Sequence, residues 1–397
     1  MATNAKNLAE LLNTDTTIAV GDVADGSITT AKLADGDITT AKLADNAVTG
    51  AKLFSENLGR RNLLINGAMR VHQRGTTGQP VGGYGYGCDR WRGYNSGTAR
   101  YDVVREDVTD LATFHSCYKL TVTTAQSSYG SDISVPIEQS IEGTNAARLS
   151  FGTSNAQTIT VSFYVKSSVT GDFSCAIFNG NPIDRSIVQN WTVNSANTWE
   201  RKTLTFAGDT SGTWRTDSLA GMYIALASIG GSSGTARASA ANTWEAGYKN
   251  HLANSTNIFA TNSATMRFTG IQIEIGDAAT PFEHFSFGED LRLCERYYQE
   301  YECCGQEWIY NESGAATHKW WFSFIFTPMR GTPTTSLSSG FLGGGSMGTT
   351  VSSLSREGIS KNRISWRVTH AANAGTGNMV YHTDSFTGDK VLMNAEI

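Results

Sequence analysis

The sequence predicts a mainly β protein, with an N-terminal repeat stalk, a jelly-roll β-sandwich, one short helix and a small C-terminal β domain. Three observations indicate this fold class. Only 17% of the 397 residues are charged, whereas 41 are glycine and 10% are aromatic, as is typical of all-β proteins with many turns. Segments that alternate apolar with polar residues are separated by polar loops. A short repeat near the N-terminus fits neither a helix nor a strand.

Changes in sequence texture divide the chain into five regions. The expected boundaries are 1–26 for an N-terminal segment, 27–60 for the repeat stalk and its connector, 61–285 for the sandwich, 286–304 for a helix linker, and 305–397 for the C-terminal β domain.

The repeat region reads SITTAKLADGDITTAKLADNAVTGAKL. Its aligned copies give one β-branched and one leucine column, which are Ile28, Ile38, Val48 and Leu33, Leu43, Leu53. So few large apolar side chains cannot offset the ordering entropy of a single chain, but several identical chains around a common axis can bury them. We therefore expect an oligomeric stalk, with three chains as the favoured number. A disordered linker is the alternative, and the strict register of the columns argues against it.

The sandwich is predicted from short strand patterns with no helical segments between them. In TITVSFYV, Ile159, Val161, Phe163 and Val165 share one face and polar residues share the other, which is the pattern of a half-buried strand. Many such strands favour a two-sheet sandwich or a jelly roll. We also expect Trp91, in CDRWRGY, to lie in the core.

The short helix is predicted around SFGEDLRLCERYYQEY. Ser286 and Glu289 have the spacing of a capping box. A helix that continued to the end of this stretch would have an apolar face formed by Leu291, Cys294, Tyr298 and Tyr301. Beyond Gly305 the alternation of KWWFSFIFTP predicts strands of the C-terminal β domain.

Composition and patterning also exclude several functions. The net charge is −5, and there is no stripe of Lys and Arg, so nucleic-acid binding is not expected. No apolar run is long enough for a membrane span, and residues 1–13 lack the pattern of a signal peptide. The six cysteines form no CxxC motif. We expect buried thiols, and we assign no metal-site residues and no cofactor. Binding of a Ca²⁺ ion and intermolecular pairing of Cys303 and Cys304 stay open.

Three stretches resemble bacteriophage tail-fibre proteins. The repeats are similar to shaft repeats of these fibres, and RRNLLINGAMRVHQRGTT, with the later CDRW, resembles their first sandwich strand. The most specific stretch is IQIEIGDAATPFEHFSFGEDLRLCERYYQEY, which is similar to the last sandwich strand, an ATPFE turn and a helix ending in a Cys-x-Arg-Tyr-Tyr pattern. Met69 and His72 stand where the family has bulky aromatics, so no ligand role is carried over to them.

The resemblance implies a homotrimeric virion protein, assembled in the bacterial cytoplasm, that attaches to other tail proteins through its N-terminus. It also implies a sandwich like a carbohydrate-binding module and a C-terminal tip that faces the host. We therefore expect a tail fibre that attaches the virion to host cell-surface polysaccharide.

A glycan site needs flat aromatic faces beside polar groups. GTWRTD brings Trp214, Arg215 and Asp217 together in the sandwich region. The aromatic residues of the tip, where loops would carry receptor contacts, are Trp308, Tyr310, Trp321, Phe341 and Tyr381. Core packing is the alternative role for any one tryptophan.

An enzyme is not expected. Glycosidases use paired carboxylates, but the obvious acidic residues have structural explanations: they are Glu274, Glu283, Glu289 and Asp290. Glu289 caps the predicted helix, and Asp290 is favoured at its N-terminus by the helix dipole. A polysaccharide-degrading tail spike and a purely structural fibre without receptor contact are the alternatives.

Overall fold

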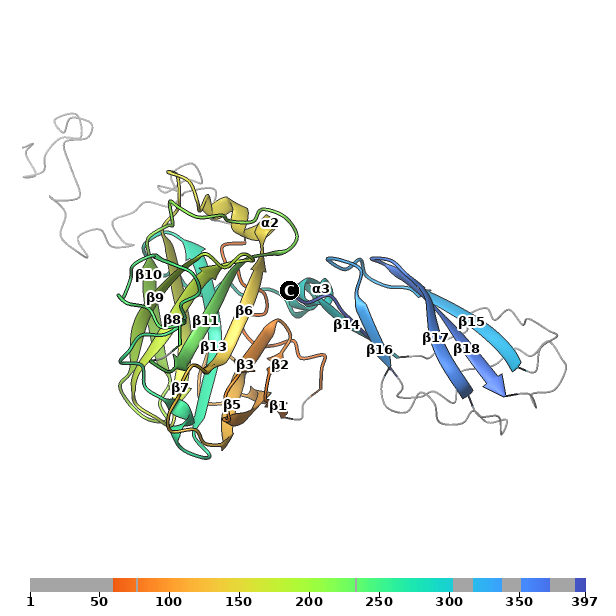
Figure 1. Cartoon of the computed structure of the whole chain (residues 1–397), viewed down its shortest axis with the longest axis horizontal. Helices are drawn as coiled ribbons and strands as arrows, with labels where there is room; N and C mark the ends of the chain where they lie inside the picture. Colours follow the sequence, from red (N-terminus) through yellow and green to blue (C-terminus); the bar gives the residue numbers. More distant parts are fainter. Residues whose placement is uncertain (1–59, 76–77, 233, 303–316, 338–350, 372–389) are drawn as a thin grey trace, which may run out of the picture. The chain divides into compact units, whose positions relative to one another are not determined.

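The structure is a computed structural model that describes residues 60–75, 78–232, 234–302, 317–337, 351–371 and 390–397 (Figure 1). The repeat stalk, with its columns from Ile28 to Leu53, lies outside the described residues.

The main domain is a sandwich of two antiparallel sheets, packed face to face (Figure 1). The six-stranded sheet has the order β1 (Gln79–Val81), β4 (Arg100–Asp107), β5 (Ser116–Thr124), β13 (Thr265–Ile275), β7 (Ile159–Ser167) and β10 (Glu200–Phe206). The seven-stranded sheet has the order β12 (Glu245–Ala246), β9 (Arg185–Val193), β8 (Gly171–Asn179), β11 (Ala220–Gly230), β6 (Ile133–Glu142), β3 (Trp91–Asn95) and β2 (Tyr84–Cys88). The predicted mainly β fold class is confirmed.

The core lies between the two sheets and is built by strand alternation. The predicted inward residues of β7 are almost completely buried, as are Trp91 and Tyr118; those of β7 are Ile159, Val161, Phe163 and Val165. The cysteines for which the structure gives an environment are free, buried thiols, as predicted: Cys88, Cys117, Cys175 and Cys294. Burial of this kind supplies most of the stability of a sandwich.

The stretch that resembles a first sandwich strand does not form one. Residues 61–75 contain no strand, although Leu63 and Leu64 are buried in the core. Asn66 and Met69 both have φ of 57°, which a strand cannot accommodate. The Asn66 side chain accepts hydrogen bonds from the backbone N–H groups of Arg70 and Val71. A buried Asn turn therefore replaces the expected alternation in this stretch.

The predicted capping box is confirmed, but the helix is shorter than expected. Helix α3 (Phe287–Glu295) begins with reciprocal hydrogen bonds between Ser286 and Glu289. The next residues form β14 (Tyr298–Glu302), which pairs with β19 (Lys390–Asn394). Tyr298 and Tyr301 are therefore strand residues rather than members of a helical face, because tertiary pairing overrides the local period.

The C-terminal region contains two small sheets. One has the order β14, β19 and β16 (Thr334–Leu337), and the other β15 (Thr317–Ile325), β18 (Arg363–Ala371) and β17 (Val351–Ile359). Short helical turns complete the described chain: α2 (Gly143–Ala146), η5 (Ala147–Leu149) and η6 (Ile258–Ala260).

One buried and one partly buried arginine join the sandwich to the sheet that contains β14 and β19. Arg90 is 2% exposed and pairs with Glu396, while its guanidinium carbon lies 3.5 Å from the centre of the Tyr297 ring. Arg74 lies over the rings of Tyr86 and Tyr298, at 4.1 and 3.7 Å. We call these contacts the arginine junction. Cations stacked on aromatic rings and paired with a carboxylate fix the relative position of the groups they join.

Candidate functional site

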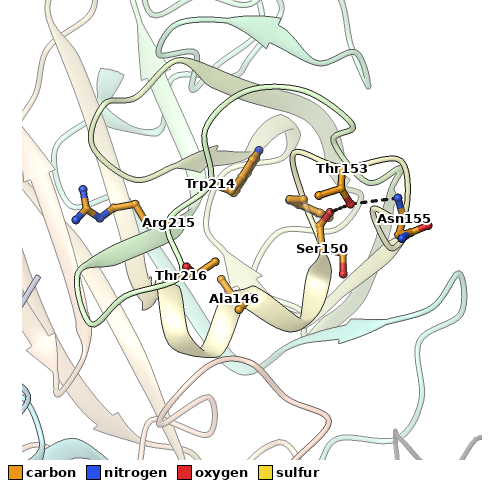
Figure 2. Close-up of a pocket in the computed structure, with 9 residues that line it drawn as sticks. Ala146, Ser150, Thr153, Asn155, Trp214, Arg215 and Thr216 are labelled. Carbon is orange, nitrogen blue, oxygen red and sulfur yellow. Dashed lines mark hydrogen bonds between the residues drawn. The ribbon is translucent and has the colours of Figure 1, made fainter.

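Two of the three sandwich residues predicted to bind glycan lie at one pocket. Trp214 and Arg215 line a pocket of about 330 Å³ between the α2–η5 turn with its following loop and the β10–β11 loop (Figure 2). Asp217 does not line the pocket but forms an ion pair with Arg215. The sequence therefore correctly identified Trp214 as a candidate that lies at a pocket. Its role in glycan binding stays a prediction.

Trp214 is held in place by aromatic and polar contacts. Its ring meets Phe151 edge to face at 4.8 Å and Trp244 at 5.6 Å. Its indole N–H donates to the backbone oxygen of Ser211 at 3.1 Å. The ring is only partly buried. This arrangement provides a rigid aromatic wall, which costs little side-chain entropy when a ligand binds.

The Arg215 guanidinium points away from Ser150, Thr153 and Asn155 on the opposite wall (Figure 2). It donates to both carboxylate oxygens of Asp217. This contact holds the pKa of the Asp217 carboxyl below its usual value. The charge of Arg215 is therefore neutralised beside the pocket.

The predicted tip residues lie almost entirely outside the described chain: Trp308, Tyr310, Phe341 and Tyr381. Trp321 lies in β15, opposite Arg367 of β18. The prediction that these residues contact a receptor stays open.

A second surface, which the sequence analysis missed, lies on the outer face of the seven-stranded sheet. We call it the tyrosine surface, and it consists of Tyr84, Arg92, Tyr94, Glu138, Tyr223 and Tyr248. Tyr84 and Tyr94 are cross-strand partners whose ring centres are 4.7 Å apart. Tyr84 is 61% exposed, so its ring is open to solvent. Large exposed aromatic groups on a strand face are characteristic of binding surfaces.

Glycines on the inner face explain why these side chains point outward. In YGYGCDRWRGY, Gly85, Gly87 and Gly93 alternate with Tyr and Arg. A Cβ atom on Gly87 would lie 2.7 Å from the Tyr118 ring, and one on Gly93 would lie 2.7 Å from the Tyr101 hydroxyl. The core therefore requires glycine on the inner face. This alternation of glycine with aromatic residues is the sequence signal that could have identified the surface.

An ion pair lies beside these rings. Arg92 Nε donates to Glu138 Oε1 at 2.8 Å, and the guanidinium carbon of Arg92 lies 4.3 Å from the centre of the Tyr84 ring. Burial raises the pKa of the Glu138 carboxyl despite the opposing effect of Arg92. Burial likewise raises the pKa of the Tyr223 hydroxyl. The surface therefore has partly desolvated polar groups, whose hydrogen bonds are stronger than those of fully solvated groups.

The segment after β11 covers the neighbouring part of this outer face. Phe178 stacks on Tyr223 at 5.0 Å and meets Tyr248 edge to face at 4.9 Å. Ala238 and Leu252 from the same segment are buried with Phe178 in a second apolar cluster. Phe178 and the segment after β11 thus pack against Tyr223 and Tyr248, which limits the motion of these two rings.

The acidic residues weighed as catalytic candidates have structural partners. Glu274 accepts from the Thr280 backbone and hydroxyl, and Glu283 accepts from the Asn62 backbone. Glu289 caps α3. Asp290 lies 3.7 Å from Arg70. Glu289 therefore has the capping role that was predicted for it, and Glu283 holds the backbone at Asn62.

Asp290 departs from the expectation that the helix dipole favours its charge. Burial raises the pKa of its carboxyl from 3.8 to about 6, against the opposing charge of Arg70. A carboxyl whose folded-state pKa is raised stabilises the fold below its unfolded pKa, and this contribution is lost as pH rises through 6. We expect Asp290→Asn, which mimics the protonated form, to gain up to about 3 kcal/mol relative to the wild type between pH 4 and 7.5.

Urea unfolding of both proteins at several pH values measures this difference. If the helix N-terminus and Arg70 govern the charge instead, Asp290→Asn will lose stability relative to the wild type as pH rises over the same range. Glu289→Gln is the control for a general loss of negative charge at this helix end.

In the part of the chain that the structure describes, no three His, Cys, Asp or Glu side chains gather as a metal site. None of the described helices is both long and apolar enough to cross a membrane.

Comparison with known proteins gives weak structural likenesses only. No protein-family model and no curated protein sequence matches the chain. A solved structure of the enzymatically active domain of tailspike protein 4 from bacteriophage CBA120 is 10% identical, with a TM-score of 0.31, over 54% of this chain and 21% of that one. The chain thus spans about a fifth of the length of that domain.

Carbohydrate-binding modules give similar values. A family 4 module is 14% identical, with a TM-score of 0.28, over 53% of this chain and 98% of that one. A family 11 module from Clostridium thermocellum, in complex with a mixed-linked tetrasaccharide, is 12% identical, with a TM-score of 0.26, over 52% of this chain and 100% of that one. At such low TM-scores, the function must be argued from the residues of this chain.

Proposed function

We propose that the protein is a bacteriophage tail fibre that attaches the virion to its host by binding cell-surface polysaccharide through the tyrosine surface. The resemblance of the repeats and of the ATPFE-to-RYY stretch to tail fibres supports the structural role. The observation that carries glycan binding is the exposed Tyr84 ring beside Tyr94 and the Arg92–Glu138 pair.

The chemistry of the tyrosine surface suits a sugar chain. A pyranose has apolar C–H faces, which pack on aromatic rings, and hydroxyl groups around its edge, which need hydrogen-bond partners. Tyr84 and Tyr94 supply the rings, while Arg92 and Glu138 supply a donor and an acceptor close by. Hydrogen bonds to charged groups contribute more than neutral ones, about 1.5–3 kcal/mol each. The surface lies on rigid strands, so little ordering entropy is lost when a glycan binds.

In our proposal the repeat stalk makes binding multivalent, because its β-branched and leucine columns hold three chains together. Three chains joined by the stalk would carry three tyrosine surfaces, and rebinding of a nearby surface raises the effective concentration. The N-terminal segment 1–26 would attach the trimer to other tail proteins. Several weak contacts then hold the virion firmly, although each contact dissociates readily.

Binding of the full-length protein to host cells tests the proposal. We expect saturable binding that isolated host polysaccharide competes away, and we expect Tyr84→Ala to weaken binding of the isolated polysaccharide by at least about tenfold. Arg92→Met should have a similar effect, because it removes the donor and leaves Glu138 unpaired. Tyr164→Ala is a matched control, since Tyr164 is a partly buried tyrosine on the other sheet.

Sedimentation of the same preparations separates binding from assembly. The wild type should sediment as three chains, and Tyr84→Ala should as well. A Tyr84→Ala protein that falls apart into single chains would identify the tyrosine surface as a contact between copies and refute the glycan role. Unchanged polysaccharide binding by Tyr84→Ala and Arg92→Met would refute it too. New reducing ends in the polysaccharide would indicate an enzyme instead.

A further inference from the structure

The pocket at Trp214 is distinct from the tyrosine surface. It lies between the α2–η5 turn with the loop that follows it, residues 150–157 before β7, and the loop of residues 207–219 between β10 and β11 (Figure 2). The tyrosine surface lies on strands β2, β3, β6 and β11, with Tyr248 added from the loop after β12. Glycan binding through that surface therefore leaves the pocket without a role.

Close backbone contacts fix the two loops against each other. Gly152 has φ of 81°, and a Cβ atom there would lie 3.0 Å from the Gly212 oxygen and 3.2 Å from Cδ1 of Trp214. The Gly152 N–H donates to the backbone oxygen of Asp209 at 2.7 Å. Arg185 in turn donates to both carboxylate oxygens of Asp209. Glycine at position 152 is thus what lets the first loop lie against Trp214.

The lining combines an apolar wall with hydrogen-bonding groups that have capacity to spare. Trp214, Phe151, Ala146 and Ala147 form the apolar part. Among the described residues, the Ser150 and Thr216 hydroxyls and the Asn155 side-chain amide have no hydrogen-bond partner in the protein. Figure 2 shows Ser150 and Asn155 on the side of the pocket opposite Arg215. These groups offer both donors and acceptors.

Size and charge narrow the class of ligand. A volume of about 330 Å³ is at the lower end of the range of roughly 300–1,000 Å³ that holds small ligands. One sugar ring fits these dimensions, whereas a run of several rings does not. Among the described residues, the one charged side chain that lines the pocket is Arg215, which is neutralised by Asp217. An acidic sugar would find no free cation to offset the loss of its hydration.

We propose that this pocket is a second glycan site that binds a single neutral pyranose, such as the terminal or side-branch residue of a surface polysaccharide. Its ligand class rests on the proposed glycan-binding function, but its residues are separate from the tyrosine surface. The sugar's C–H face packs on Trp214, and its hydroxyls bond to Ser150, Asn155 and Thr216. The tyrosine surface thereby binds the polysaccharide chain, while the pocket selects one sugar unit of it.

Saturation-transfer NMR with the full chain tests this site. The probes are methyl pyranosides of glucose, galactose, mannose, N-acetylglucosamine and rhamnose, with methyl glucuronide as the charged comparison. We expect at least one neutral glycoside to receive saturation with millimolar affinity. Asn155→Ala combined with Thr216→Val should weaken that affinity by at least about tenfold, since both positions are exposed and the changes leave the core intact.

A blocking variant and its matched control complete the test. Ala147 is exposed and lines the pocket, so Ala147→Trp should abolish the signal, whereas Asn145→Trp, an exposed neighbour outside the pocket, should preserve it. Tyr84→Ala should preserve it as well. The inference is overturned if no neutral glycoside binds, if methyl glucuronide alone binds, or if Ala147→Trp leaves binding unchanged. The two experiments are independent. Loss of the glycoside signal would not change the result expected for Tyr84→Ala with polysaccharide, and unchanged polysaccharide binding by Tyr84→Ala would not change the result expected at the pocket.

Discussion

Arg90→Met is expected to destabilise the protein by about 3 kcal/mol, because it removes a charge-assisted hydrogen bond from the Glu396 carboxylate, which then keeps Arg74 at 3.1 Å as its arginine partner. Arg90 is 2% exposed, pairs with Glu396 and donates to the Ser140 backbone oxygen at 2.5 Å. Methionine keeps most of the side-chain volume and is as unbranched at Cβ as arginine, so the backbone at φ of 71° is no more strained than before. What is lost is the charge and its hydrogen bonds.

Guanidinium-chloride unfolding, followed by tryptophan fluorescence, measures the change. The contact between the sandwich and the β14–β19 sheet should weaken first, so limited proteolysis should cut the variant near residue 296 faster than the wild type. Arg201→Met is the control, since Arg201 is exposed and its side chain donates to the Thr280 backbone oxygen at the surface. Equal stability of the Arg90→Met and Arg201→Met proteins would mean that the arginine junction contributes nothing.

Trp91→Ala should cost about 3–5 kcal/mol, the usual range for a large aromatic removed from a core. Trp91 is 0% exposed and lies in the main apolar cluster between the sheets. Its indole N–H also donates to the backbone oxygen of Asn66 at 2.9 Å. This hydrogen bond links the buried turn after Leu64 to strand β3. The cavity and the lost hydrogen bond act on the same turn, so their costs reinforce each other.

Two further variants separate the effect of the cavity from that of the lost hydrogen bond and compare Trp91 with an exposed tryptophan. Trp91→Phe keeps much of the ring but removes the donor, and we expect a loss of only about 1–2 kcal/mol because Asn66 still accepts from the Met69 N–H. Trp199→Ala removes a partly exposed indole that bonds to Asp110 and should cost less than about 1 kcal/mol. Thermal unfolding of the three variants gives the ranking, and a Trp199→Ala loss as large as that of Trp91→Ala would contradict it.

Local rules predicted the parts of the fold that local sequence controls. Alternation placed Ile159 and Phe163 inward, and the Ser286–Glu289 pair marked the start of α3. Both signals act within a few residues, where the period of the chain and the geometry of a cap decide the outcome. Trp91 was predicted as core for a similar reason, since a large apolar ring beside a strand is usually buried.

Long-range pairing decided the rest. The end of α3 depends on β19, almost a hundred residues away in sequence, which takes Tyr298 into a sheet. The tyrosine surface likewise needs Tyr84, Tyr94 and Tyr223 to meet from three strands, and no local pattern brings them together. For Trp214 a polar, aromatic stretch was enough to predict a candidate residue, but the pocket itself needs the loop of residues 150–157, which four strands separate from Trp214 in sequence.

The Gly152 contact has a consequence for how binding preference can change over generations. The pocket is made by loops outside the strand pairing, so exchanges at exposed positions such as Asn155 and Thr216 leave the β7–β10 register untouched. By contrast, Tyr84 and Arg92 belong to strands whose inner glycines are fixed by the core. If the proposed glycan binding holds, changes in ligand preference should therefore accumulate at the pocket rim, between two loops that meet at Gly152, while the sheet surface changes slowly.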